Sequence, residues 1–392
     1  MVKRHLELKI KQWSKQYPVV TVTGPRQSGK TTLCRALFKN KPYVSLEDID
    51  NREYARTDPR GFLSEYPDGA LLDEIQNAPD LVSYIQTIVD DKQRSGMFIL
   101  TGSRQFEMME KVSQSLAGRT AVANLFPFSF NELYKNLQST SGLSLDNVIY
   151  TGFYPRIHDK KLNPTEAYSF YVSTYLERDV RKILAVADIS RFETFLRLCA
   201  GRTGQLLNLV SLGNDCGVSH NTVKSWISVL QASGILKLLL PWHVNVGKRM
   251  IKSPKLYFID TGLACCLLGI HNSEQLRGHP LRGALFETFI VSDAYKQIDH
   301  SGGHQQLWFC QDSNKNEIDL LVGNDRELTG IEIKSAMTVA SSFFKGFRLM
   351  SSSIKPMNEQ VIVYGGEKAF NREKTKVIPW RKIGKLFASG NL

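Results

Sequence analysis

Short apolar runs alternate with stretches of helical periodicity in the first 130 residues of the chain. The runs at 19–23 (VVTVT), 70–72 (ALL) and 97–100 (MFIL) are dominated by β-branched or aliphatic residues, which is typical of buried strands. Residues 31–38 (TTLCRALF) instead space their apolar side chains along one face of a helix. Strands that alternate with helices predict an α/β fold with a parallel sheet.

The pattern changes between residues 206 and 240. Two helical segments, 206–216 and 220–230, flank a turn at 217–219, and the apolar run at 234–240 predicts a strand. This order is typical of a winged helix; the alternative is a module that packs against protein. The second helix of a winged helix would present these polar residues to a DNA groove: Ser219, His220, Asn221, Lys224 and Ser225.

The last third of the chain predicts a second α/β region. Residues 316–322 (NEIDLLV), 330–335 (GIEIKS) and 360–364 (QVIVY) have strand composition, and 284–289 (ALFETF) predicts a helix with a buried apolar face. The first of these strands is apolar on both faces near its end, so we expect it to be buried.

Composition narrows the class of protein. The chain has 392 residues, enough for two to four domains. No apolar run approaches the ~18 residues of a membrane span, and the first ten residues lack the apolar core of a signal peptide, so we expect a cytoplasmic protein with no membrane partner. The six cysteines form no C-x-x-C pair, so neither a zinc site nor a disulfide framework is indicated.

The net charge of +12 favours an anionic partner such as DNA. Half of that excess lies between residues 195 and 260, where eight basic residues are offset by two acidic residues, Asp215 and Asp260. The eight are Arg197, Arg202, Lys224, Lys237, Lys248, Arg249, Lys252 and Lys255.

One motif predicts specific chemistry. The segment from Gly24 to Thr31 (GPRQSGKT) matches the phosphate-binding loop G-x-x-x-x-G-K-[ST], between a predicted strand and a predicted helix. Backbone N–H groups and the helix dipole favour phosphate there, Lys30 would reach the β- and γ-phosphates of ATP, and Thr31 would ligate Mg²⁺. The expected nucleotide contacts are Gly24, Pro25, Arg26, Gln27, Ser28, Gly29, Lys30, Thr31 and Thr32.

Two further strand ends complete the predicted nucleotide site. Asp73 and Glu74 follow an apolar run, so Asp73 would hold Mg²⁺ through water and Glu74 would polarise the attacking water as a general base. Ser103, or else Thr101, would sense the γ-phosphate at the end of the next strand. Arg119 could act in trans as an arginine finger, act in cis as a γ-phosphate sensor, or be an ordinary surface residue. Its rivals as the finger are Arg178 and Arg181, which could instead lie on a solvated helix face.

Ordered sequence blocks between residues 23 and 180, with weaker matches to about residue 340, make the chain resemble a prokaryotic AAA+-type P-loop ATPase family with a C-terminal domain of unknown function. The blocks are TGPRQSGKTTL, LLDEIQNAP, ILTGSRQ, SLAGRT, LFPFSFNEL, GFYPRI and YLERDV. The resemblance implies ATPase roles for Lys30, Thr31, Asp73 and Glu74. ATPases of this kind usually form homo-oligomeric rings.

The arrangement D…E-x-K in the last third resembles the PD-(D/E)xK nuclease core. Asp319 and Glu332 would hold Mg²⁺ or Mn²⁺, with Glu287 as a further ligand from the predicted helix, and Lys334 would orient the attacking water. Glu332 and Lys334 share a strand face because they are two residues apart. The alternative is a nuclease-like fold retained for binding only.

Together these patterns predict an α/β chain of four parts. They are an AAA+-type ATPase core (1–130), a helical lid (131–194), a winged helix (195–260) and a nuclease-like α/β domain (261–392). The function expected is Mg-ATP hydrolysis coupled to DNA binding or remodelling, with metal-dependent cleavage as a further activity. The rivals are an ATP-controlled signalling or defence switch whose last domain only docks DNA or a partner, and a non-catalytic DNA-binding regulator.

Overall fold

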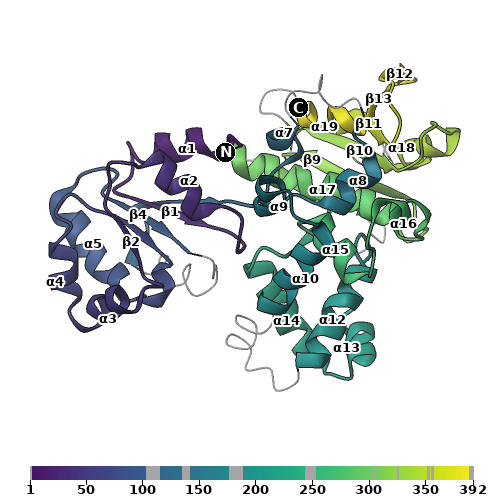
Figure 1. Ribbon diagram of the computed structural model, residues 1–392. Helices are drawn as coiled ribbons and strands as arrows, with labels where there is room; N and C mark the ends of the chain where they lie inside the picture. Colours follow the sequence, from purple (N-terminus) through teal and green to yellow (C-terminus); the bar gives the residue numbers. More distant parts are fainter. Residues whose placement is uncertain are drawn as a thin grey trace. The chain divides into compact units, whose positions relative to one another are not determined.

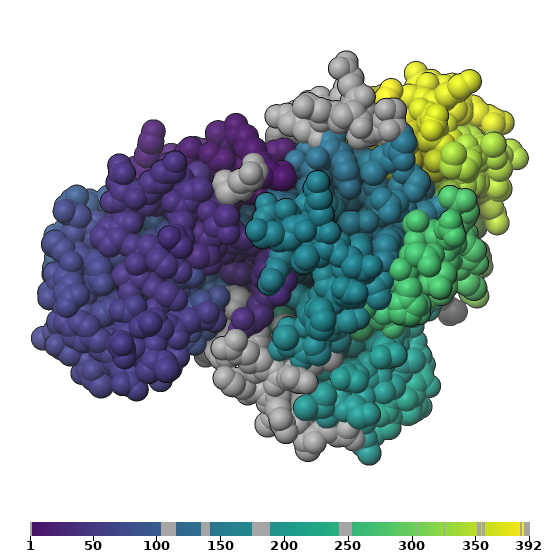
Figure 2. Space-filling model, viewed as in Figure 1, coloured from purple at the N-terminus to yellow at the C-terminus, as the bar shows by residue number. Residues whose placement is uncertain are grey.

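The chain divides into two compact units in the computed structural model (Figure 1). The structure describes residues 2–102, 115–134, 142–175, 189–242, 253–303, 305–324, 326–350, 354 and 357–387. The first unit comprises Met1–Phe128 with the short segments Ala232–Gly234 and Asp299–Gly302, and the second comprises Ser129–Gln231, Ile235–Ile298 and Gly303–Leu392. Figure 2 shows all atoms in the same view, with the first unit in purple to blue and the second in blue-teal to yellow.

The first unit is built on a parallel five-stranded sheet in the order β2-β3-β4-β1-β5. The strands are β1 (Val19–Thr23), β2 (Tyr43–Ser45), β3 (Leu71–Asp73), β4 (Phe98–Thr101) and β5 (Thr120–Asn124). The helices are α1 (Leu6–Trp13), α2 (Lys30–Leu37), α3 (Ile49–Thr57), α4 (Pro59–Ser64) and α5 (Leu81–Lys92), with a 3-10 turn η1 (Ile75–Asn77). The strands and the helix predicted for this region are therefore confirmed.

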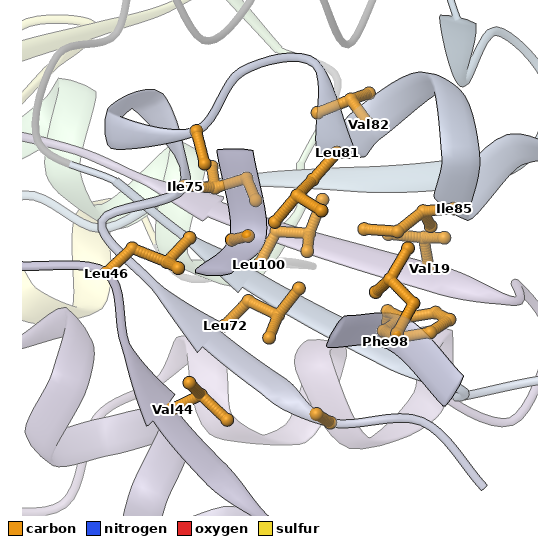
Figure 3. Close-up of a cluster of buried hydrophobic side chains, with 14 of the residues drawn as sticks. Val19, Val44, Leu46, Leu72, Ile75, Leu81, Val82, Ile85, Phe98 and Leu100 are labelled. Carbon is orange, nitrogen blue, oxygen red and sulfur yellow. The ribbon is translucent and has the colours of Figure 1, made fainter. Parts of the chain in front are cut away.

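Alternate residues of these strands enter two separate cores, because side chains point to opposite faces of a sheet. Val19, Leu72 and Leu100 pack with residues of α3 to α5 on one face (Figure 3). Val20 and Ile99 pack with residues of α1 and α2 on the other. Burial of both faces explains why the strands are apolar throughout and fixes the carboxyl ends of β1, β3 and β4 at one edge of the sheet.

The second unit contains a mixed sheet of eight strands in the order β12-β13-β11-β10-β9-β8-β6-β7. Its strands are β6 (Leu236–Pro241), β7 (Lys255–Phe258), β8 (Gln306–Gln311), β9 (Glu317–Gly323), β10 (Leu328–Lys334), β11 (Met357–Tyr364), β12 (Phe370–Arg372) and β13 (Thr375–Pro379). Strands β8, β9 and β10 form an antiparallel meander, and β11 runs parallel to β10. The predicted strand at 360–364 is confirmed as part of β11, and β13 and β12 continue the sheet beyond it.

Helices of the second unit carry most of its aromatic core. They are α7 (Phe130–Leu133), α8 (Leu145–Thr151), α9 (Pro155–Lys160), α10 (Pro164–Tyr175), α12 (Ile189–Gly201), α13 (Leu209–Cys216), α14 (His220–Ala232), α15 (Thr261–Leu267), α16 (Ser273–Gly278), α17 (Arg282–Ser301), α18 (Lys345–Met350) and α19 (Ile383–Leu386), with 3-10 turns η4 (Ser341–Phe344) and η6 (Trp380–Lys382). Phe289 of α17 stacks on Phe153 and meets Phe130 and Trp380 edge-on, so residues far apart in the chain share one core.

The helix–turn–helix pattern is confirmed at the level of secondary structure. Helix α13 ends at Cys216 and is followed by Gly217, whose φ of 66° is the left-handed conformation that glycine adopts without strain; α14 begins at His220. Strands β6 and β7 follow as an antiparallel pair, and β6 also pairs with β8, so the sheet continues across residue 260. No helix in the described part of the chain has the length and apolar character needed to cross a membrane.

Candidate active sites

The predicted phosphate-binding loop lies between β1 and α2, at the carboxyl edge of the parallel sheet. Two of its glycines are required by geometry. A Cβ on Gly24 would lie 2.2 Å from the carbonyl oxygen of Leu125, and Gly29, the residue directly before α2, has a φ of 92°. Gln27 also has a positive φ, 59°, so the loop is a tight turn that brings successive backbone groups round one point.

Lys30 lies in this loop as a buried cation whose hydrogen bonds go to backbone carbonyl groups. Its Nζ donates to the carbonyl oxygens of Gly24 and Pro25, at 3.0 Å and 2.8 Å. Burial lowers its pKa to about 8, against the opposing influence of Glu74 and Asp73. The buried Oγ of Ser28 also lacks a hydrogen-bond partner within the described ranges. A buried ammonium and an orphan hydroxyl in a backbone cradle fit a phosphate group.

The Asp73 carboxylate accepts hydrogen bonds from hydroxyl groups on three elements at the carboxyl edge of the sheet. Thr31 Oγ1, at the start of α2, donates to both carboxylate oxygens at 3.0 Å, and the Tyr43 hydroxyl, on β2, donates at 2.9 Å. The buried Thr101 hydroxyl, at the end of β4, donates as well. A threonine hydroxyl beside a carboxylate is the donor set that Mg²⁺ takes in phosphate-binding loop proteins, so the residues present fit that ion.

Glu74 is held in a turn anchored by the core. Its φ of 57° and ψ of 47° are left-handed, and η1 follows directly. Ile75 enters the apolar cluster beside Leu46 and Leu72, as Figure 3 shows. The Gln76 amide, only 8% exposed, donates a hydrogen bond to the Glu74 carboxylate. Sequence reasoning missed Gln76, although it stands two residues after Glu74 in the motif that drew attention to the turn.

Arg119 lies at the opposite edge of the sheet from the phosphate-binding loop. It immediately precedes β5, which runs parallel to β1, so the five-residue strand separates it from the loop by about 15 Å. Its guanidinium pairs with both carboxylate oxygens of Asp90, at 2.5 Å and 2.8 Å. The strand holds Arg119 away from the loop of its own chain, which favours the predicted role in trans over the role in cis. Ser103, Arg178 and Arg181 lie outside the described residues.

Other loop residues differ in exposure. Pro25 is buried, Arg26 is half-buried, and Gln27 and Thr32 are exposed.

A buried arginine supports the loop through backbone groups. Arg4 is 4% exposed and donates to the carbonyl oxygens of Ser28 and Phe126, at 2.9 Å and 2.6 Å. No sequence signal marked Arg4, because its partners are backbone atoms far along the chain.

A second cluster of charges lies on the meander of the second unit. Lys334 Nζ is 2.9 Å from Asp319 Oδ2 and 2.7 Å from Glu332 Oε2, and the Ile333 N–H donates to Asp319 at 2.7 Å. Asp319 is 7% and Glu332 is 3% exposed. The structure therefore brings together the three residues predicted from D…E-x-K, because antiparallel β9 and β10 place them side by side.

Glu287 joins the same cluster from α17 through a lysine that sequence reasoning misassigned. Lys255 Nζ lies 3.1 Å from Glu287 Oε1 and also pairs with Glu317, while the Tyr257 hydroxyl donates to Glu287. One carboxylate oxygen from each of Glu287, Glu317 and Asp319 lies within 4.8 Å of the others, a grouping that could hold a metal ion.

Two members of this cluster were missed or misread. Glu317 stands two residues before Asp319, so the period of two along a strand could have identified it. Lys255 was counted with the basic residues expected to attract DNA. That count is wrong at this position, because Lys255 is 4% exposed and ion-paired.

The pKa values of the cluster reflect its excess of carboxyl groups. Burial raises the pKa of Glu317 to about 7 and raises that of Glu332 well above its ordinary value. Burial acts on Asp319 too, but the Lys334 and Lys255 ammonium groups outweigh it and lower its pKa. Burial opposes the charged form of both lysines, yet the neighbouring carboxylates raise their pKa values. A cation would suit this site better than an anion.

The predicted groove-facing residues lie on the exposed side of α14 or, for Ser219, directly before it. Ser219, His220, Asn221, Lys224 and Ser225 are all exposed, whereas Val223, Trp226 and Ile227 are buried. Of the basic residues predicted to assist, Arg202 pairs with Asp215, Lys237 lies over the Tyr295 ring, and Arg197 is exposed. Lys248, Arg249 and Lys252 lie outside the described residues.

Comparison with protein-family models matches three segments of the chain. Residues 16–134 match a model described as AAA domain. Residues 142–274 and 282–383 match two models, each described as a domain of unknown function, DUF8612 and DUF4143.

Two curated relatives align with most of the chain. The uncharacterized protein Rv2008c of Mycobacterium tuberculosis is 30% identical over 368 residues, which cover 92% of this chain and 79% of the relative. The uncharacterized protein Mb2031c of Mycobacterium bovis has the same identity and coverage.

Solved structures give weaker similarity. The Walker-type ATPase PABY2304 of Pyrococcus abyssi is 15% identical with a TM-score of 0.43, covering 68% of this chain and 96% of that one. The RuvB Holliday junction branch migration motor of Thermotoga maritima is 19% identical with a TM-score of 0.29, covering 59% and 86%. TM-scores below 0.5 add nothing to the assignment.

Proposed function

Because the chain belongs to the same family as the mycobacterial protein Rv2008c, and its N-terminal unit is an AAA-type P-loop ATPase domain, we propose that it couples Mg-ATP hydrolysis to binding or remodelling of DNA. The observation that carries the ATPase assignment is the convergence at one sheet edge of Lys30, Asp73 and the Thr31 hydroxyl.

Each residue at this edge has a role that its position permits. Lys30 exchanges its two carbonyl acceptors for phosphate oxygens when ATP binds. Thr31 and Asp73 would hold Mg²⁺, which would supply positive charge beside the phosphates. Glu74, held by Gln76, accepts a proton from the attacking water. Thr101 keeps the Asp73 carboxylate oriented.

The DNA part of the proposal is supported by the exposed polar face of α14. This helix follows a tight turn and presents Lys224 with small polar side chains, as helices that enter a major groove do. The test is ATPase activity with and without single-stranded, duplex and branched DNA, together with direct DNA binding. Stimulation by at least one DNA shape is expected, and an ATPase that neither binds nor responds to any of them would contradict the coupling.

We further propose a ring or other homo-oligomer in which Arg119 acts in trans. The support is its position at the far edge of the sheet, which leaves a neighbouring subunit as its possible target. Arg119→Ala and Lys30→Ala proteins, each inactive alone, should recover ATPase activity when mixed. Absence of rescue, with both proteins folded and of the same oligomeric size, would remove Arg119 from this role.

A second candidate activity is a metal-dependent phosphodiesterase in the second unit. It is supported by the cluster of Asp319, Glu332, Lys334 and Glu287, and by the element order α17, β8, β9, β10, α18, β11, which suits a PD-(D/E)xK nuclease-like fold. Mg²⁺ or Mn²⁺ would polarise the scissile phosphate. The protein would hold that ion with carboxylates and orient water with Lys334.

Cleavage should require the metal and be lost in Asp319→Asn, while ATP hydrolysis continues. If the wild-type protein cleaves no single-stranded, duplex or branched DNA with either metal, the cluster serves docking only. The rival function, an ATP-controlled switch, would then be favoured if Glu74→Gln leaves the protein active in assembly without ATP turnover.

A further inference from the structure

The cluster in the second unit consists of two lysines that each bridge two carboxyl groups. Lys334 lies between Asp319 and Glu332, and Lys255 lies between Glu287 and Glu317. Two ammonium groups therefore face four carboxyl groups. The Oε1 atom of Glu332 is also buried without a hydrogen-bond partner in the described parts of the chain. The balance leaves room for further positive charge.

Lys255 differs from Lys334 in where it originates. It opens β7, the edge strand of the sheet order, rather than the β9–β10 pair that supplies Asp319 and Glu332. Its ammonium contacts two of the three carboxylates whose oxygens come within 4.8 Å of one another. The ammonium thus occupies the cation position of this group, at hydrogen-bond distance from oxygens that a metal would need.

We propose that Lys255 is the resident counter-cation of this cluster and sets its affinity for a divalent metal ion, which binds by displacing the Lys255 ammonium from Glu287 and Glu317. This inference rests on the metal site proposed above. A metal ion on the same oxygens would lie within a few ångströms of the ammonium, where like charges repel strongly in a buried site. Lys334 contacts Asp319, the third carboxylate of this group, and Glu332, so the cation that contacts both Glu287 and Glu317 is Lys255.

The proposal predicts that removing the Lys255 charge tightens metal binding. Mn²⁺ alone is the probe, followed by the electron paramagnetic resonance of the free ion, on the full chain without nucleotide. All proteins carry Asp73→Asn, so that the N-terminal site does not contribute. Lys255→Met should lower the dissociation constant for Mn²⁺ at least about tenfold, since a buried positive charge has been removed from the site.

The matched control is Lys376→Met, which removes an exposed lysine paired with Glu359 on the same sheet and should leave Mn²⁺ binding unchanged. Lys255→Gln keeps a polar group and should act in the same direction if the Met variant does not fold. Asp319→Asn should weaken Mn²⁺ binding in every background.

Two results would overturn the inference, and they are distinguishable. If binding depends on Asp319 but neither Lys255 variant tightens it, the metal site stands and Lys255 does not govern it. If no protein binds Mn²⁺ in an Asp319-dependent way, the metal site itself fails, and this inference fails with it.

Discussion

Each of the two units buries a lysine at a candidate site, but the surroundings of the two lysines favour ligands of opposite charge. Lys30 donates to two backbone carbonyls, and burial lowers its pKa to about 8. Lys255 lies between two carboxylates, which raise its pKa in spite of burial. A lysine whose charge is poorly balanced favours an added anion, whereas carboxylates in excess over lysines favour an added cation. Motif spacing predicts both sites, but the partners of the lysine decide what each would bind.

The largest expected effect tests the anion half of this comparison. Lys30→Ala removes two charge-assisted hydrogen bonds to phosphate, each contributing about 1.5–3 kcal/mol, so ATP affinity should fall about 10²- to 10⁴-fold. Equilibrium binding of a fluorescent ATP analogue measures the loss. Lys160→Ala, on an exposed position of α9, is the control. Retained affinity would mean that Lys30 does not face the nucleotide.

The next effect separates binding from turnover at the same edge. Glu74→Gln keeps the shape of the side chain but cannot accept a proton, so kcat should fall about 10²-fold while ATP affinity changes little. Steady-state hydrolysis and ATP binding are measured on the same preparation. If both fall together, Glu74 supports the fold of the turn rather than the chemical step.

The residues of the first candidate site could be grouped from the sequence because their geometry is local. Two glycines, a lysine and a threonine occupy one loop between adjacent elements, and the strand ends bearing Asp73 and Thr101 meet at the sheet edge as parallel topology requires. Arg119 could not be placed in this way. Its distance from the loop depends on whether β5 runs parallel or antiparallel to β1, and the sequence alone does not give that direction.

The second site was predicted in part for the same reason. Asp319, Glu332 and Lys334 lie on two strands joined by a hairpin, so spacing sufficed. Lys255 comes from a strand more than sixty residues earlier, and its contact with Glu317 depends on the path of the whole sheet. In the sequence, Lys255 is one of eight basic residues between 195 and 260, and no pattern distinguishes it from the others.

A smaller effect tests whether the turn after β3 positions Glu74. Gln76→Leu preserves volume but removes the amide that donates to the Glu74 carboxylate, so kcat should fall about tenfold, as for a lost hydrogen bond to a charged group. ATP affinity should stay unchanged, and Gln76→Asn or Gln76→Glu should differ from Leu in kcat. A fall in affinity or thermal stability with kcat preserved would instead assign Gln76 a structural role.

The low pKa of Lys30 can be tested by measuring ATP affinity as a function of pH. Because the free protein holds the pKa of Lys30 at about 8, and a phosphate anion favours the charged form, ATP binding takes up a proton above that pH. Affinity should be constant below about pH 8 and then weaken by up to about tenfold per unit as pH rises. Calorimetry in buffers of different ionisation enthalpy measures the proton uptake. A flat profile to pH 9.5 would contradict the low pKa.

The smallest expected effect concerns a third kind of lysine, one that is exposed. Lys224 lies on the outer face of α14, where solvent screens its charge, so it should contribute to DNA affinity by releasing a counterion rather than by filling a buried site. Lys224→Ala should weaken DNA binding roughly fivefold at 0.1 M salt and reduce the slope of log K against log salt by about 0.9, the value for one lost phosphate contact. Fluorescence anisotropy across a salt series measures both, with Lys160→Ala again as the control. An unchanged slope would place α14 outside the DNA interface and leave its exposed polar face to bind a protein partner, which is the alternative that its sequence pattern left open.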